Sequence, residues 1–264
     1  MIRATCLLIF FLSAMASAAA PAPMQVFIAG DSTAAEWGPE FYPQFGWGMV
    51  LKCAFDDDVT VRNYALSGRS SKSFIEEGQF ARIEREMKAG DTLLIQFGHN
   101  DQKIGDRSRY TAPDGDYRTW LMRYVESARA KGVQPVLITP VARRLFEKGV
   151  LVDSHAPYAK AVREVAAQSG TPLIDLTADS MQWISKLGDE SSKRYYLVYT
   201  REDRVPRFPN GSQDNSHFSE LGARKVADLV ATRLAELNLP VSKRIKASRP
   251  GLTRNTALGA PRCS

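Results

Sequence analysis

Residues 25–33 read QVFIAGDST, and this stretch decides the fold. An apolar run of strand length ends abruptly in a turn sequence. Four similar runs follow it, at 59–64, 92–97, 135–139 and 172–175. Longer stretches with helix-period apolar residues lie near 45–55, 73–88, 117–131, 155–169 and 219–237. This alternation predicts an α/β protein with three layers, α/β/α, around a five-stranded, mostly parallel sheet.

Polar motifs follow the first three predicted strands. They are GDST at 30–33, SGRSS at 67–71 and GHND at 98–101. In a parallel sheet the carboxyl ends of the strands share one edge, and ligands bind in the crevice beyond it. The three motifs are therefore expected to converge on one site.

The N-terminal segment has one cation, Arg3, then an apolar run and a cluster of alanines that ends near residue 20. This pattern is typical of a secretory signal peptide, and the apolar run is too short for a convincing membrane span. We expect residues 1–20 to be removed, no membrane span in the mature protein, and secretion or delivery to the periplasm. Residues 21–240 have the length of one α/β domain, expected to be a monomer.

The formal charge of +6 is concentrated in residues 241–264, which hold six basic residues and no acidic one. Without these six and Arg3, 28 basic residues face 29 acidic ones, so nucleic acid is not an expected partner of the domain. The tail is rich in proline and glycine and poor in apolar periodicity, which predicts disorder. We expect it to be dispensable for hydrolysis, with polyanion binding as an alternative role.

Two cysteines, Cys53 and Cys263, lie outside the predicted signal peptide. An exported protein can form a disulfide between them. A disordered tail instead favours the interpretation of Cys53 as a free core residue. No Cys/His cluster has zinc-ligand spacing, and we expect neither a metal nor another cofactor.

A candidate catalytic set combines Ser32 with Asp214 and His217, which lie just before the last predicted helix. Serine becomes a useful nucleophile when a base takes its proton, and a carboxylate can orient and stabilise that base. Each motif also has a purely structural interpretation. Gly-Asp-Ser is ordinary turn chemistry, and residues 214–219 could simply cap a helix.

Acyl transfer also needs hydrogen-bond donors for the oxyanion. The backbone N–H groups of Ser32 and Gly68 and the side-chain amide of Asn100 are the candidates. The alternative is that Gly68 and Asn100 only form turns.

The order Gly-Asp-Ser, Gly, Gly-x-Asn-Asp and Asp-x-x-His resembles the SGNH (GDSL-like) hydrolase superfamily, from about residue 27 to 235. Within it, the segments IAGDST, NYALSGRSS, LIQFGHNDQ, TPVARRLF and DNSHFSELGA are similar to the rhamnogalacturonan acetylesterase family. The resemblance implies a flavodoxin-like fold and no metal. It assigns Ser32 as nucleophile, Gly68 and Asn100 as oxyanion donors, Asp214 as acid and His217 as base.

The same resemblance implies a carbohydrate esterase that removes O-acetyl groups from pectic rhamnogalacturonan. One departure lies at residues 155–158, His-Ala-Pro-Tyr, where relatives have His-Gly-x-Tyr; it leaves the sugar cleft less well defined. The rival activities are hydrolysis of acetylated xylan, peptidoglycan, a lipid or a thioester. The rival from another class is a carbohydrate-binding protein without catalysis.

Candidate substrate contacts are Trp37, Arg69, Arg143 and His155, since flat aromatic faces suit sugars and guanidinium groups suit uronates. For each of them burial in the core, a solvated surface position or helix capping is the alternative. Residues 189–213 are expected to form an irregular wall of the cleft.

His99, Asp31 and Asp101 flank the expected centre. We interpret His99 as a buried structural residue, and the two carboxylates as supports for the Ser32 and Asn100 loops. A two-carboxylate glycosidase is the less favoured interpretation.

Overall fold

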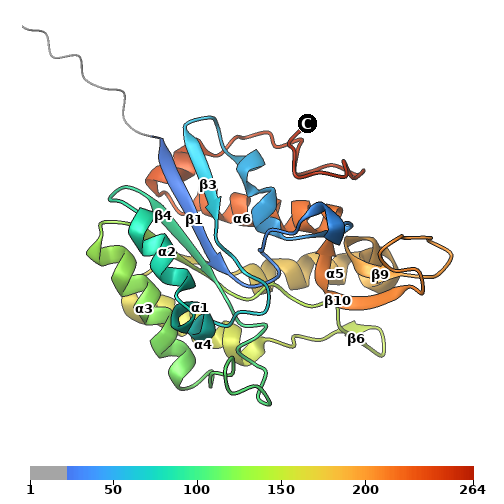
Figure 1. Ribbon diagram of the computed structural model, residues 1–264, viewed down its shortest axis with the longest axis horizontal. Coiled ribbons are helices and arrows are strands. Elements are labelled where there is room, and N and C mark those ends of the chain that lie inside the picture. Colours follow the sequence, from blue (N-terminus) through green and yellow to red (C-terminus); the bar gives the residue numbers. More distant parts are fainter. Residues whose placement is uncertain (1–22) are drawn as a thin grey trace, which may run out of the picture.

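The computed structural model describes residues 23–264, and the predicted signal peptide lies outside the described residues. Five parallel strands form the central sheet in the order β3-β1-β4-β5-β8 (Figure 1). This is the doubly wound order of flavodoxin-like folds. The predicted fold class and the five predicted strands are thus confirmed. The strands are β1 (Met24–Gly30), β3 (Val59–Asn63), β4 (Thr92–Gln96), β5 (Gln134–Ile138) and β8 (Leu173–Ile174).

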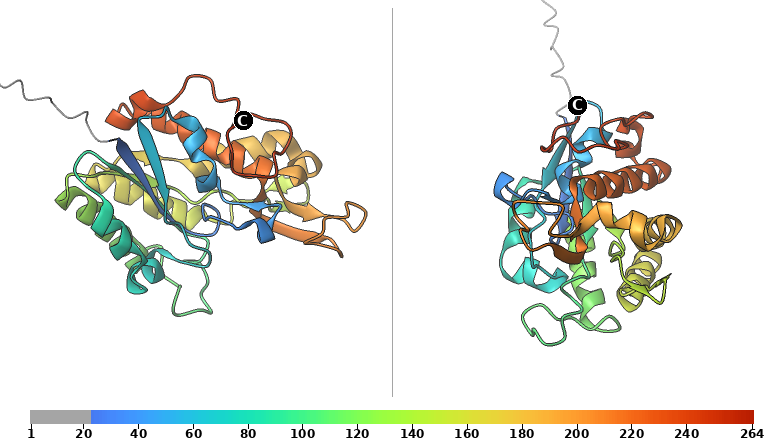
Figure 2. Two further views of the ribbon diagram at one scale, coloured as in Figure 1. Left: turned by 45° about the horizontal axis from the view of Figure 1, so that its top comes forward. Right: turned by 90° about the vertical axis from the view of Figure 1, so that its right-hand side faces the viewer.

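Each inner strand is apolar on both faces because helices cover both sides of the sheet (Figures 1 and 2). In β1, Phe27 packs against one helical layer while Val26 and Ile28 pack against the other. The first layer contains α1 (Ser71–Glu76), α2 (Gln79–Glu86), α3 (Asp116–Ala130) and α4 (Ala156–Ser169). The second contains α5 (Leu176–Ser192), α6 (Glu220–Glu236) and 3-10 turns at Trp47–Met49 and Leu51–Ala54.

Several elements differ from the expected ones. The stretch predicted as one helix near 73–88 is broken at Gly78, which has a φ of +74° and separates α1 from α2. Helix α5 was not predicted, and of its large apolar residues only Leu176 and Ile184 are fully buried. Short 3-10 turns replace the helix expected near 45–55.

A second, antiparallel sheet lies beside the carboxyl edge of the main sheet (Figure 1). It consists of β2 (Gln44–Phe45), β10 (Ser212–Ser219) and β9 (Tyr196–Tyr199), with β10 in the middle. A separate hairpin joins β6 (Phe146–Glu147) to β7 (Val150–Leu151). Part of the segment expected to be an irregular wall, 189–213, is therefore regular strand and helix.

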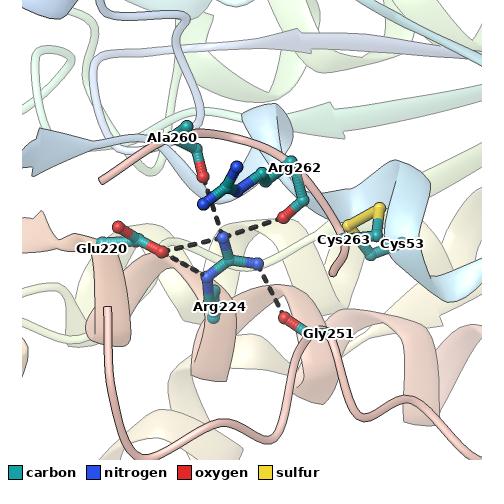
Figure 3. The surroundings of a disulfide bond; sticks show 7 residues. All are labelled: Cys53, Glu220, Arg224, Gly251, Ala260, Arg262 and Cys263. Carbon is teal, nitrogen blue, oxygen red and sulfur yellow. Dashed lines mark hydrogen bonds and ion pairs between the residues drawn. A yellow bond between two sulfur atoms is a disulfide. The ribbon is translucent and has the colours of Figure 1, made fainter. Parts of the chain in front are cut away.

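The prediction of a disordered C-terminal tail is wrong. The tail runs back over α6, and Val241 and Leu252 are buried in the core (Figure 2). Arg224 of α6 is fully buried beneath it and donates to the carbonyl oxygens of Gly251, Ala260 and Arg262 at 2.7–3.0 Å (Figure 3). The tail supplies the acceptors that this buried guanidinium needs, and the composition of the tail does not reveal this role. The domain therefore extends beyond the predicted boundary at 240.

Cys53 is not a free core residue but forms a disulfide with Cys263, with the two Cα atoms 5.3 Å apart. The bond closes a loop across a sequence separation of 210 residues. Cross-links of this kind chiefly reduce the conformational entropy of the unfolded chain.

Replacing Cys53 by serine is expected to lower the free energy of unfolding by about 2–5 kcal/mol. Urea denaturation of the variant and the wild type, with and without reductant, measures this. Reduced wild type should match the variant. Equal stability of the oxidised wild type and the variant would contradict a stabilising bond.

None of the helices within residues 23–264 combines the length and the apolar character that crossing a membrane requires.

Candidate active site

Ser32, His217 and Asp214 are joined by hydrogen bonds at the carboxyl edge of the main sheet. His217 Nε2 lies 2.9 Å from Ser32 Oγ, and His217 Nδ1 lies 2.7 Å from Asp214 Oδ2. With the proton on Nδ1, Nε2 is free to accept the serine proton. The fold thus brings together the three predicted catalytic residues, although Ser32 and His217 are 185 positions apart in the chain. They stand in the order nucleophile, base and carboxylate that activates a serine.

An irregularity in β10 places both Asp214 and His217 toward Ser32. The register of β10 against β9 shifts between Asp214 and Phe218. Within this bulge the N–H groups of Ser216 and His217 donate to Asp214 Oδ1 at 2.9 and 3.0 Å. A regular strand would alternate side chains between its two faces, so the bulge re-aims them.

The same contacts keep Asp214 ionised. Burial raises the pKa of Asp214. The hydrogen bond and charge of His217 and the two backbone N–H groups lower it by more, so that the net pKa is about 2. The carboxylate is therefore charged at any pH above about 3, available to stabilise an imidazolium.

Asp31 stabilises the turn that carries Ser32. Its Oδ1 accepts from the N–H and the hydroxyl of Thr33 at 2.9 and 2.7 Å, and its Oδ2 lies 3.2 Å from His99 Nδ1. Burial opposes the charge of Asp31, but His99 and Thr33 keep the pKa of this carboxyl below its ordinary value. His99 and Asp31 thus have the supporting roles that we expected, with both side chains buried.

The predicted oxyanion donors lie on connected loops. The N–H of Leu66 donates to the oxygen of Gly30 at 3.0 Å, and Asn100 Nδ2 donates to the oxygen of Arg69 at 3.0 Å. Gly68, with a φ of +77°, forms the turn between these two links. Among the described residues, neither the N–H of Ser32 nor that of Gly68 has a hydrogen-bond acceptor.

A hollow of about 190 Å³ opens over the three catalytic candidates. Its lining is mostly polar, and its size suits an acetyl group and part of a sugar rather than a long acyl chain. It is lined by Ser32, Thr33, His99, Asn100, Lys103, Arg143, Asp214, Ser216 and His217.

Of the four predicted substrate contacts, only Arg143 lines this hollow. His155 is fully buried, 2.9 Å from the amide of Gln102, so no sugar reaches it in this structure. Arg69 does not line the hollow and forms an ion pair with Glu77 at 2.7 Å. Trp37 is half-buried and does not line this hollow; it donates to the backbone oxygen of Ser32 at 3.2 Å, and its ring is nearly perpendicular to that of His217.

Arg144 is buried and braces the catalytic loop. Its N–H donates to the oxygen of Asn215 at 2.8 Å, and its Nη1 to Asn215 Oδ1 at 2.5 Å. Its other donors hold Asp189 and Ser192 of α5. The bulge between the two triad residues is therefore tied to a helix that was not predicted. Lys103 was also missed, because a lysine near a loop motif carries no distinctive signal.

Asp101 links the Asn100 loop to α1. Its Oδ1 accepts from the N–H and the hydroxyl of Ser71 and from the Thr111 hydroxyl, at 2.5–3.0 Å. Its Oδ2 has no partner among the described residues. Burial raises the pKa of Asp101 to about 7 against these hydrogen bonds.

Between about pH 4 and 7 the carboxyl of Asp101 is protonated in the folded protein but ionised in the unfolded chain, because folding raises its pKa to about 7. The free energy of unfolding therefore has its full value below about pH 4. It falls by about 1.4 kcal/mol per pH unit as pH rises to about 7. Asp101→Asn is expected to remove this slope, so that the variant gains stability relative to wild type between pH 4 and 7. Urea denaturation at intervals across that range tests this, and parallel profiles for the two proteins would contradict it.

The doubly wound α/β/α fold with a serine, a histidine and an aspartate hydrogen-bonded at its carboxyl edge defines an SGNH-type hydrolase. The model of the GDSL-like lipase/acylhydrolase family matches residues 28–225, and the chain belongs to this family. It is accordingly a carboxylic ester hydrolase.

Curated relatives cover most of the chain. This chain is 42% identical over 230 residues to rhamnogalacturonan acetylesterase RhgT of Bacillus subtilis, and the aligned part covers 87% of this chain and 97% of that protein. It is 31% identical to rhamnogalacturonan acetylesterase of Emericella nidulans, covering 77% of this chain and 81% of that protein. Among solved structures, YxiM of Bacillus subtilis has a TM-score of 0.68 at 24% identity, over 81% of this chain and 56% of that one, and shares the fold.

Proposed function

We propose that this protein is an exported serine esterase that removes O-acetyl groups from rhamnogalacturonan through an acetyl-enzyme on Ser32. The observation that carries the proposal is the continuous relay from Ser32 Oγ through the imidazole of His217 to Asp214, at 2.9 and 2.7 Å. Such a relay is the usual means of activating a serine hydroxyl.

In the first step Ser32 Oγ attacks the acetyl carbonyl carbon while His217 Nε2 accepts the hydroxyl proton. The oxyanion receives hydrogen bonds from the N–H groups of Ser32 and Gly68 and from Asn100, while Asp214 stabilises the imidazolium. The tetrahedral intermediate then collapses. The carbon–oxygen bond to the sugar breaks, and His217 returns the proton to the departing sugar hydroxyl.

In the second step water takes the place of the sugar. His217 accepts a proton from water, the resulting hydroxide attacks the acetyl-serine, and the bond to Ser32 Oγ breaks with return of the proton. Acetate leaves, and the enzyme is restored without any cofactor.

The choice of substrate rests on the relatives' names and on the hollow. Two of the relatives that cover most of the chain are named rhamnogalacturonan acetylesterases. The small, polar hollow supports an acetyl ester on a glycan over a lipid, which would need an apolar trough for its acyl chain.

The test is acetate release from acetylated rhamnogalacturonan, acetylated xylan and 4-nitrophenyl acetate by the mature protein. Release should be fastest from rhamnogalacturonan and should fall by at least about a thousandfold in Ser32→Ala, because the nucleophile is gone. Ser185→Ala, at an exposed position of α5, is the matched control. Activity that survives in Ser32→Ala would refute the mechanism, and preference for xylan would refute the substrate.

Export is supported by the composition of the first twenty residues and by the Cys53–Cys263 disulfide, which an oxidising compartment favours. Fractionation of the producing cells and the N-terminal residue of the mature protein test it. A full-length protein found in the reducing cytosol would refute it.

A further inference from the structure

Two cations face the hollow without an acidic partner. Arg143 and Lys103 both line it beside Ser32 and His217, and neither forms an ion pair with any residue of the described part of the chain. Arg143 is half-buried, and its Nε has no hydrogen-bond acceptor there. Arginine is rarely buried without a paired charge, so a half-buried one without an anionic partner is unusual.

The nearby carboxylates are already engaged. Asp214 is held by His217 and two backbone N–H groups, and Asp31 is held by Thr33 and His99. Asp214 is the only carboxylate among the lining residues. Because its charge serves His217, the hollow keeps an excess of positive charge beside the reacting serine.

The guanidinium of Arg143 is held by the side-chain amide of Gln102. In the amide orientation that satisfies all of its neighbours, Gln102 accepts from both terminal nitrogens of Arg143, at 3.0 and 3.2 Å. The same amide donates to His155 Nδ1 at 2.9 Å. Burial keeps the pKa of His155 well below its ordinary value, so its ring is neutral and can accept this hydrogen bond. The buried His155 thus orients Gln102, which orients Arg143.

A desolvated charge without a counter-ion costs free energy unless a ligand supplies one. A rigid guanidinium beside an ammonium is suited to a planar carboxylate. We propose that Arg143 and Lys103 form a subsite for the carboxylate of an acidic sugar at or next to the acetylated position. The inference rests on the proposed function and deepens it by naming the two side chains that would recognise the uronate of the substrate.

The first experiment compares two substrates: an acetylated rhamnogalacturonan oligosaccharide and the same oligosaccharide with its galacturonates converted to methyl esters, which removes each negative charge at the cost of one added methyl group. The wild type should favour the acid form in kcat/KM by about tenfold or more, equivalent to about 1.4 kcal/mol. Arg143→Gln should bring the ratio near one, and Lys103→Gln should lower it partly. The ratio of kcat/KM on the acid form to that on the methyl ester is measured within each variant, so a general loss of activity does not change it.

Lys88→Gln is the matched control, because Lys88 is an exposed cation that precedes β4, at the sheet edge opposite the site. It should keep the wild-type ratio. Raising the salt concentration should reduce the wild-type preference and leave that of Arg143→Gln unchanged. Equal rates of wild type on the two substrates, or a preference that persists in Arg143→Gln, would overturn the subsite while leaving the proposed function intact.

A second readout does not depend on the glycan ester. Galacturonate should inhibit hydrolysis of 4-nitrophenyl acetate competitively, methyl galacturonate ester should inhibit at least fivefold less, and Arg143→Gln should remove the difference. Equal inhibition by the acid and the ester would refute the subsite. An enzyme that is inhibited selectively by the acid but releases no acetate from rhamnogalacturonan would keep the subsite and refute the proposed substrate.

Discussion

His217→Ala is expected to lower kcat by about 10⁴-fold to 10⁶-fold, the largest effect that we predict for a single residue. The variant keeps Ser32 but loses the base whose Nε2 lies 2.9 Å from Oγ. It also leaves the charge of Asp214 without its imidazole partner. Binding of the acetyl group and the oxyanion donors should survive, so the residual rate should still exceed the uncatalysed one.

Single-turnover and steady-state hydrolysis of 4-nitrophenyl acetate measure this effect. Asp214→Asn should cost about 10⁴-fold, because the wrong tautomer of His217 is then favoured. Gln213→Ala, exposed on the same strand, should change kcat less than twofold. A loss of less than about tenfold in a folded His217→Ala variant would show that another base serves Ser32.

Arg224→Met is expected to lower the free energy of unfolding by about 3–5 kcal/mol. The side chain is fully buried, with Nε 2.8 Å from Glu220 Oε1 and the other nitrogens on three tail carbonyls (Figure 3). Removing the cation leaves the carboxylate of Glu220 buried without its partner, together with the three carbonyl oxygens. The tail should loosen, although the disulfide still holds its end.

Urea denaturation measures the loss. Arg233→Met on the same helix is the matched control: its side chain is 44% exposed, although its partner Asp179 is only 10% exposed. It should therefore cost about 1–2 kcal/mol, clearly less than Arg224→Met. Adding Glu220→Gln to Arg224→Met should recover part of the loss, because the unpaired charge is removed. Equal costs for Arg224→Met and Arg233→Met would contradict a structural role for the buried pair.

The contacts of Arg224 and Glu220 also predict the effect of deleting the C-terminal tail. Composition predicts that residues 241–264 are dispensable for hydrolysis. Their removal should instead destabilise the domain, because Arg224 loses three acceptors and Glu220 loses the N–H groups of Leu258 and Gly259 at 2.8 Å. Glu220 begins α6 only three residues after His217, so loosening there reaches the catalytic loop.

The central sheet and the catalytic set were predictable because their signals are local. Five short apolar runs, each followed by a turn or a polar motif, identify the strands, and the topology of parallel sheets brings the motifs after them to one edge. Gly-Asp-Ser after the first strand and Asp-x-x-His before the last helix are equally local. The sequence alone therefore predicts Ser32, Asp214 and His217 as the catalytic set.

The sequence alone therefore determined the layered fold, the catalytic candidates and the family. Tertiary structure decided the rest: the folding of the basic tail over Arg224, the pairing of Cys53 with Cys263, the brace from Arg144 to Asn215, and which of the predicted cations faces the substrate. These features depend on partners far apart in the chain, and a side chain's own neighbours in sequence say nothing about which distant donor or acceptor will satisfy it once it is buried.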